Sequence, residues 1–272
     1  MLLTLGGYLG LMRVPNGLIA VVSILVTSYS VTRSFGPGRA VLFGAAAAFL
    51  ILSGGNSLND YFDREIDVVN KPHRPIPSGR VAPHRALIFA AFLFCGGLGL
   101  SAFLNAGALA LAVLNTCLLI VYARYSKAMH LFGNLLVAWM TSSVFLFAGA
   151  ILGRIDLHVV VLAASAFFIM VTREILKDIE DLEGDRRSGA STLPIRWGVK
   201  RARTVAGLCV LPAVLAIFLP VAVRPMDGPY LALILLATAA LGTSLFLQPG
   251  KAQKVVKAAT LVVLLAFIAG SW

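Results

Sequence analysis

The stretch Asn59-Asp60-Tyr61-Phe62-Asp63-Arg64-Glu65-Ile66-Asp67 follows directly on an apolar run, Ala40 to Asn59, that contains no Asp, Glu, Lys or Arg. Its three aspartates are offset by 3 and 4 residues. On a helix at about 100° per residue, such positions fall within roughly 60° of one another. A run of roughly 20 apolar residues is also long enough to cross a bilayer. The stretch therefore predicts a membrane-spanning helix that carries a row of carboxylates on one face of its end.

The composition extends this prediction to the whole chain. Of 272 residues, 59% are hydrophobic and only 13% are charged, which is far from the average of soluble proteins. We therefore expect a single all-α integral membrane domain over residues 1–272, with about nine spans. The expected spans are Val14–Thr32, Ala40–Asn59, two within Ala86–Ala123 separated near Asn105, Ala128–Gly153, Leu157–Thr172 with a continuation past Arg173, Thr204–Val223, Gly228–Gly250 and Ala258–Trp272.

The basic residues predict an orientation in the cell membrane. If the N-terminus is cytoplasmic, the inner loops hold 19 of the 23 Lys and Arg residues, and only Arg33, Arg39, Arg154 and Arg224 lie outside. Both acidic segments then lie on the cytoplasmic side. Because the net charge of +11 is distributed over loops between spans rather than on one soluble face, it does not indicate nucleic-acid binding.

A second acidic segment repeats the first. Asp178, Asp181 and Asp185 have the same offsets of 3 and 4, each 118 residues after its counterpart, and the two segments contain ten of the twelve carboxylates. We expect this trio to share one helix face as well. Solvated loop acids balanced by nearby bases would explain the charges, but not the matched spacing. Rows of carboxylates at the end of an apolar span favour a hard cation, and Mg²⁺ is the natural choice.

The spacing of the two segments also predicts a repeat. Four spans separate them, so both have the same direction in the membrane, which indicates two parallel four-helix halves. The two acidic rows are then expected to face each other.

At these residues the sequence resembles the UbiA family of intramembrane prenyltransferases. Residues 59–67 match the family's NDxxDxxxD motif, and residues 178–185 match its DxxDxxxD motif. The resemblance implies nine helices around a central cavity, with cytoplasmic cap segments at about 68–85 and 186–203. The first of these contains three prolines between Lys71 and Arg80, which exclude one continuous helix.

The resemblance also implies roles for individual residues. The family's early Arg and Asn correspond to Arg13 and Asn16, and its mid-chain Tyr and Lys to Tyr122 and Lys127, which makes these four the candidate catalytic residues. Some of the basic candidates could instead neutralise neighbouring acids or contact lipid headgroups. The candidate ligands of the donor diphosphate are Arg64, Arg74, Lys177 and Lys127. The candidate Mg²⁺ ligands are Asn59, Asp60, Asp63, Asp67, Asp178, Asp181 and Asp185.

The substrates follow from the same resemblance. Within the family, residues 74–79 and 178–185 are most similar to those of archaeal members that make membrane ether lipids. This implies transfer of a geranylgeranyl group from its diphosphate to geranylgeranylglyceryl phosphate. The alternative is an aromatic acceptor such as 4-hydroxybenzoate, and a remote one is secondary transport, although the acids lie at span ends rather than at the bilayer midplane. The sequence does not indicate an oligomeric state.

Overall fold

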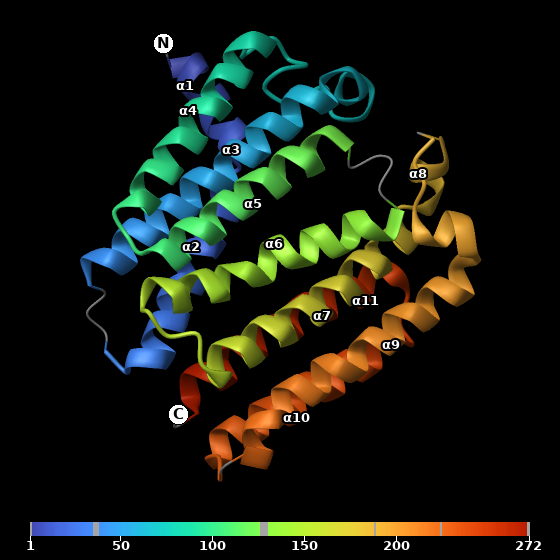
Figure 1. Ribbon diagram of the computed structural model, residues 1–272. Coiled ribbons are helices and arrows are strands. Elements are labelled where there is room, and N and C mark those ends of the chain that lie inside the picture. The colour runs from blue at the N-terminus through green and yellow to red at the C-terminus, as the bar shows by residue number, and fades with distance from the viewer. Residues whose placement is uncertain (1, 35–37, 126–129, 188, 224, 271–272) are drawn as a thin grey trace. The chain divides into compact units, whose positions relative to one another are not determined.

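The structure, a computed structural model, describes residues 2–34, 38–125, 130–187, 189–223 and 225–270. Every regular element within these ranges is a helix, as the sequence predicts (Figure 1). The helices are α1 (Leu2–Met12), α2 (Val14–Thr32), α3 (Arg39–Asn70), α4 (Pro83–Ala102), α5 (Ala106–Tyr125), α6 (His130–Ile151), α7 (Leu157–Glu180), α8 (Leu182–Arg187), α9 (Leu193–Val223), α10 (Gly228–Ser244) and α11 (Pro249–Ala269).

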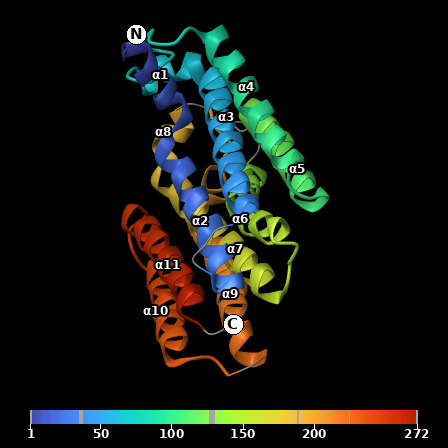
Figure 2. The same cartoon turned by 90° about the vertical axis from the view of Figure 1, so that its left-hand side faces the viewer.

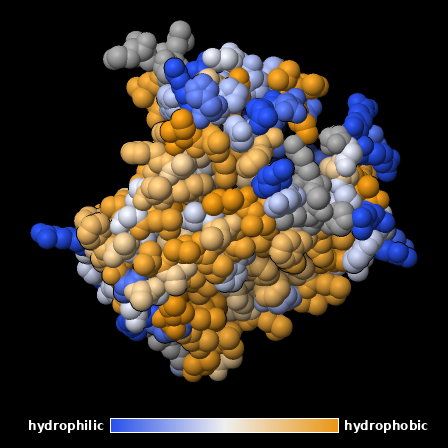
Figure 3. All heavy atoms as spheres, turned by 45° about the horizontal axis from the view of Figure 1, so that its top comes forward, coloured by the Kyte–Doolittle hydropathy of each residue, from blue (hydrophilic) through white to orange (hydrophobic). Residues whose placement is uncertain are grey.

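The helices match the expected spans. In the described part of the chain, 8 helices are long and apolar enough to cross a membrane, and α10, at 17 residues, is a shorter apolar helix. Large apolar side chains also lie on the outside of these helices: Leu208, Leu211 and Leu215 follow one face of α9 and are exposed. Figure 3 shows hydrophobic side chains over much of the face in view. Such surfaces suit contact with lipid.

Several helices are longer than their expected spans: α9 begins at Leu193 rather than Thr204, and α11 begins at Pro249 rather than Ala258. The apolar run of α3 was expected to end at Asn59, but the helix extends to Asn70 and carries the first acidic row on its last turns. Helix α7 continues past Arg173 to Glu180, as expected. The break expected near Asn105 is also present between α4 and α5, where Asn105 Oδ1 accepts the backbone N–H of Ala108 at 3.0 Å.

The chain packs into two compact units, and each contains one acidic segment. The first lies within Met1–Ser28, Ser34–Tyr125 and Phe147–Arg154, and the second within Tyr29–Arg33, Ser126–Leu146 and Ile155–Trp272. The single domain with two parallel halves stays a prediction.

The first unit depends on close packing of α3 against α4. The two helices run side by side in Figures 1 and 2. Their backbones approach closely at Gly97, where an added Cβ would lie 2.9 Å from the carbonyl oxygen of Ala47 and 2.6 Å from Ile51 Cγ1. Small residues allow such an approach, which maximises van der Waals contact where lipid removes the hydrophobic driving force between helices.

The segment between α3 and α4, residues 71–82, is folded against this unit. Ile76 and Val81 are buried with Leu11 of α1 and Ala86 of α4. The backbone N–H of Val81 donates to the carbonyl of Pro75 at 3.0 Å, which closes a compact loop. The expectation that residues 71–80 do not form one helix is confirmed, and their cytoplasmic location stays a prediction.

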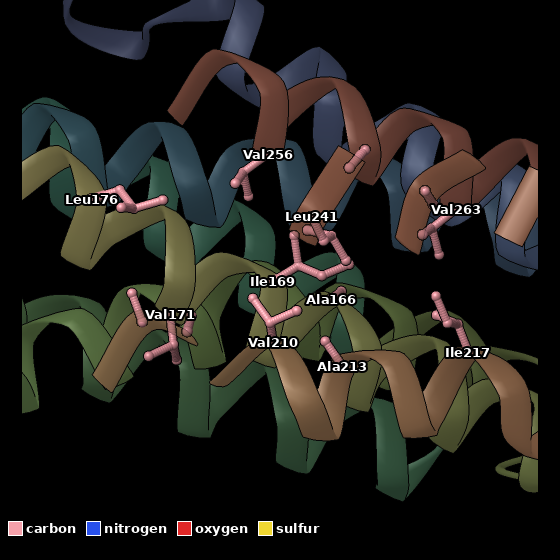
Figure 4. Close-up of a cluster of buried hydrophobic side chains, with 14 of the residues drawn as sticks. Ala166, Ile169, Val171, Leu176, Val210, Ala213, Ile217, Leu241, Val256 and Val263 are labelled. Carbon is pink, nitrogen blue, oxygen red and sulfur yellow. The ribbon is translucent and has the colours of Figure 1, made fainter. Parts of the chain in front are cut away.

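In the second unit, α7, α9, α10 and α11 surround an apolar core. Figure 4 shows Ile169 of α7, Val210 and Ile217 of α9, Leu241 of α10 and Val256 of α11 in this cluster. The second acidic row begins at Asp178, on the last turn of α7.

Gly97→Ala should destabilise the protein, because its Cβ would meet backbone atoms of α3 that cannot move aside. We expect a loss of about 1–3 kcal/mol, typical of overpacking. The matched control is Gly99→Ala on the same helix, where an added Cβ meets nothing within 4 Å. Thermal unfolding of the two purified variants in detergent measures the difference. Equal midpoints would contradict the close approach of α3 and α4.

Candidate active site

The first acidic row lies on the last three turns of α3. Asp60 is only 3% exposed, and Asp67 is also buried. Asn59 Nδ2 donates to Asp63 Oδ2 at 2.8 Å, which orients that carboxylate. All three aspartates belong to one continuous helix. The expectation that this trio shares a helix face is confirmed.

Two arginines from other elements pair with this row. Arg13 stands at the junction of α1 and α2 with φ 49, a left-handed conformation that is strained for a residue with a Cβ. Its Nη2 lies 2.5 Å from Asp60 Oδ1. Arg74, from the loop after α3, places Nη1 3.2 Å from the same oxygen, and it also pairs with Asp67 Oδ2. The buried charges of Asp60 and Asp67 are therefore compensated within the unit.

Another candidate, Arg64, lies on α3 between Asp63 and Asp67. Arg64 donates to Glu65 Oε1 at 3.1 Å, and its guanidinium lies 4.7 Å from the centre of the Tyr61 ring. Asn16 is exposed on the first turn of α2, and Tyr122 is half-buried on α5. Lys127 lies outside the described residues. The roles assigned to these four residues stay predictions.

The second acidic row crosses a helix break. Asp178 lies on the last turn of α7 and accepts a hydrogen bond from Asn134 Nδ2 of α6 at 2.8 Å. Asp181 caps the end of α7 with φ −84 and ψ 3, and Asp185 lies on the separate short helix α8. The expectation that Asp178, Asp181 and Asp185 share one face of one helix is therefore wrong.

Helix electrostatics explain the break. Carboxylates are unfavourable near the negative C-terminal end of a helix and favourable near its N-terminal end. Glu180 to Asp185 contain four acids, so ending α7 after Glu180 and starting α8 at Leu182 places Glu183 and Asp185 in a first helical turn. Arg186 and Arg187 then occupy the last turn of α8, where cations are favourable.

A polar network near the end of α7 joins it to α11. Arg173 Nη1 lies 2.6 Å from Glu174 Oε1, and Arg173 Nη2 donates to Gln253 Oε1 at 3.4 Å. Gln253 Nε2 in turn donates to Glu180 Oε2 at 2.7 Å. These contacts tie α7 to the first turns of α11, just before Asp181. Lys177, a diphosphate candidate, is half-exposed and lies 3.9 Å from Glu174 Oε2.

The donor chemistry of both rows fits a hard cation. Both rows offer only oxygen ligands, because Asn59 would bind a cation through its side-chain carbonyl oxygen, and oxygen sets select Mg²⁺ or its relatives. Burial raises the pKa of the Asp185 carboxyl, and the Asp181 carboxylate raises this pKa further, so a cation there would relieve repulsion. Over the described residues, no three His, Cys, Asp or Glu side chains converge on one point. An open row suits Mg²⁺, which usually binds one or two carboxylates and completes its shell with phosphate.

Sequence reasoning missed the residues that orient the second row. Asn134 was not predicted to be a partner of Asp178, and Gln253 was not singled out. The sequence could have indicated a role for Asn134, since it is a lone amide in an uncharged run near the start of a span. Gln253 lies among lysines at the start of α11, where a polar residue is unremarkable.

Comparison with known proteins identifies the family. A model of the UbiA prenyltransferase family matches residues 18–269. The chain belongs to this family. It is an intramembrane protein of the UbiA type, with several apolar helices that cross the bilayer.

Individual relatives cover nearly the whole chain. The digeranylgeranylglyceryl phosphate synthase of Methanopyrus kandleri is 41% identical over 268 residues, which is 96% of this chain and 98% of the relative. The synthase of the same name from Haloquadratum walsbyi is 38% identical, covering 98% of this chain and 95% of the relative.

Solved structures show the same fold. One, described as giving insights into digeranylgeranylglyceryl phosphate synthase in membranes, has a TM-score of 0.87 at 35% identity and covers 98% of each chain. A UbiA homologue from Archaeoglobus fulgidus bound to GPP and Mg²⁺ has a TM-score of 0.71 at 16% identity, covering 97% of this chain and 98% of that one. The second likeness supports the fold alone.

Asn134→Ala should lower the rate of prenyl transfer about 10-fold or more. The variant removes a donor to the Asp178 carboxylate, and a hydrogen bond to a charged group contributes about 1.5–3 kcal/mol, which is at least about tenfold in rate if it is needed in the transition state. The control is Thr141→Ala on the same helix, whose hydroxyl donates within α6 to the carbonyl of Val137 at 2.9 Å. Steady-state assays with a prenyl diphosphate compare the two. A loss of the same size in both variants would contradict a specific role for Asn134.

Proposed function

We propose that this chain transfers a geranylgeranyl group from geranylgeranyl diphosphate to geranylgeranylglyceryl phosphate, forming the second ether bond of an archaeal membrane lipid precursor. The observation that carries the proposal is the 41% identity to a digeranylgeranylglyceryl phosphate synthase over 96% of this chain and 98% of that relative. Both acidic segments fall within the aligned length. Membership of this family argues against secondary transport, the remote alternative, because the family's chemistry is prenyl transfer.

The reaction breaks the C–O bond between an allylic carbon and the diphosphate, and the electron pair leaves with the diphosphate. Mg²⁺ held by Asp60, Asp63 and Asp67, and by the second trio, would stabilise the charge that develops on the leaving group. Arginine can donate two parallel hydrogen bonds to phosphate oxygens, so Arg74 is well suited to the same task. We assign Arg64, Lys177 and Lys127 to the diphosphate as weaker candidates, because Arg64 and Lys177 also contact Glu65 and Glu174.

The remaining groups would protect and direct the allylic centre. An allylic cation reacts with any water that reaches it, so an apolar surrounding favours transfer to the intended acceptor. Each unit supplies apolar helices, and the exposed apolar faces let a long prenyl chain remain in lipid. The acceptor hydroxyl loses its proton as the new C–O bond forms. For Tyr122, Arg13 and Asn16 we propose contact with the reacting groups or the acceptor phosphate, as their counterparts in the family suggest.

The position of the site follows from the basic residues. We propose that the N-terminus and both acidic rows lie on the cytoplasmic side of the cell membrane, where the water-soluble diphosphate product can leave.

Activity should require a divalent cation and both acidic rows. We expect Asp63→Ala and Asp181→Ala each to lower turnover at least about 10²-fold, as loss of one strong transition-state stabiliser does. Glu65→Ala is the matched control, since the Glu65 side chain lies in the same segment but is 82% exposed. EDTA should abolish activity, and added Mg²⁺ should restore it. Full activity in EDTA, or near wild-type rates for either aspartate variant, would contradict the metal mechanism.

The identity of the product tests the proposed acceptor. Purified protein is incubated with geranylgeranyl diphosphate, Mg²⁺ and either geranylgeranylglyceryl phosphate or 4-hydroxybenzoate, and the extract is analysed by mass spectrometry. We expect the doubly prenylated glycerol phosphate and no prenylated 4-hydroxybenzoate. The reverse result would assign the chain to quinone synthesis and leave the family and fold unchanged.

A further inference from the structure

Two of the three aspartates of the first acidic row, Asp60 and Asp67, are paired with arginines of the chain. Asp60, almost fully buried, accepts a hydrogen bond from Arg13 at 2.5 Å through Oδ1, and the same oxygen lies 3.2 Å from Nη1 of Arg74. Arg74 bridges to Asp67 as well, and its side chain is only 16% exposed. The two buried carboxylates therefore face two guanidinium groups, and the local charge is close to balanced.

This balance opposes a free metal ion. A divalent cation at the oxygens of Asp60 and Asp67 would stand within a few ångströms of two positive guanidinium groups, in a site that water screens weakly. It would also have to displace hydrogen bonds that satisfy buried carboxylates, and breaking such pairs is costly. The arginines and the cation therefore compete for the same oxygens.

A diphosphate changes the balance. It brings several negative charges, and its oxygens accept the paired hydrogen bonds of a guanidinium at least as well as a carboxylate does. Arg74 can then move from Asp67 to phosphate while the cation takes the carboxylate oxygens.

We propose that Arg13 and Arg74 prevent stable binding of a divalent cation alone at the first acidic row, so that the cation binds there together with the diphosphate of the donor. The inference rests on the proposed function for the identity of the donor. It gives the two arginines a second task, namely to make metal binding depend on the substrate.

The loop that carries Arg74 allows the exchange without unfolding. The backbone carbonyl of Arg74 accepts from the N–H of Ser78 at 3.0 Å and from its hydroxyl at 2.7 Å. Ile76, two residues on, is buried in the cluster with Leu11. The backbone at residue 74 is therefore held, and the guanidinium changes partners by side-chain rotation alone.

The second acidic segment has a different arrangement on α7. Arg173, the arginine of that helix nearest to Asp178, contacts Glu174 and Gln253 and holds α11. The expected competition therefore belongs to the first row, which allows it to be tested by substitution of Arg74 alone.

The test measures binding of Mn²⁺ to the purified full-length protein by electron paramagnetic resonance, without any acceptor. Arg74→Met removes the charge and keeps much of the apolar stem, and Arg74→Gln is a second neutral variant. Arg74→Lys retains the charge. Arg80→Met is the matched control, because Arg80 lies in the same loop and donates to the carbonyl of His73 and to Ser78 Oγ rather than to the acidic row.

We expect Arg74→Met and Arg74→Gln to bind Mn²⁺ at least about 10-fold more tightly than the wild type, whereas Arg74→Lys and Arg80→Met match the wild type. Adding Asp60→Asn to Arg74→Met should remove the gain, which locates it at the first row. Inorganic diphosphate should tighten Mn²⁺ binding to the wild type about 10-fold, after correction for the complex formed without protein.

Equal Mn²⁺ affinity of the wild type and both neutral variants without diphosphate would overturn the inference, as would a gain that survives Asp60→Asn. Neither outcome depends on the acceptor. Detection of prenylated 4-hydroxybenzoate without the ether product in the mass-spectrometric assay would instead overturn the proposed function and leave this inference standing.

Discussion

The structure depends on the cost of holding ionised carboxylates at the ends of apolar helices. Lipid and apolar side chains do not solvate a charge, so each buried aspartate needs a compensating partner. In the first unit, Arg13 and Arg74 supply that partner for Asp60 and Asp67. This requirement explains why a strained backbone at Arg13 and a proline-rich loop at Arg74 are both packed against α3.

The two acidic segments satisfy the same requirement differently. In the first, α3 continues unbroken through the row, and arginines from outside the helix balance it. In the second, the helix itself ends, so that Glu183 and Asp185 lie in the favourable first turn of α8 rather than beyond the C-terminus of α7. Asn134 then supplies a neutral donor to Asp178. Segments with the same aspartate spacing therefore have different local structures, which suits unequal roles toward a cation and a diphosphate.

Helix packing positions these residues. Small residues such as Gly54 and Gly97 let α3 and α4 approach closely, while the core of α7, α9, α10 and α11 holds the end of α7. The polar chain from Arg173 through Gln253 to Glu180 adds hydrogen bonds at the point where α7 ends. Activity of a UbiA-type enzyme requires such rigid support, because displacing a ligand by about 1 Å can cost about 10²-fold in rate.

The sequence by itself determined the all-helical membrane fold, the positions of the spans and the two acidic segments, because hydrophobic run length and aspartate spacing are local properties. It also determined the family, through motifs that are contiguous along the chain. Only the tertiary structure decided which partners the acids have. Arg13 and Asp60 are 47 residues apart, as Asn134 and Asp178 are 44 apart, and no local pattern predicts such contacts. The break at Asp181 was likewise missed, because periodicity alone assumes a continuous helix, whereas the accumulated charge at the end of α7 makes a new helix start more favourable.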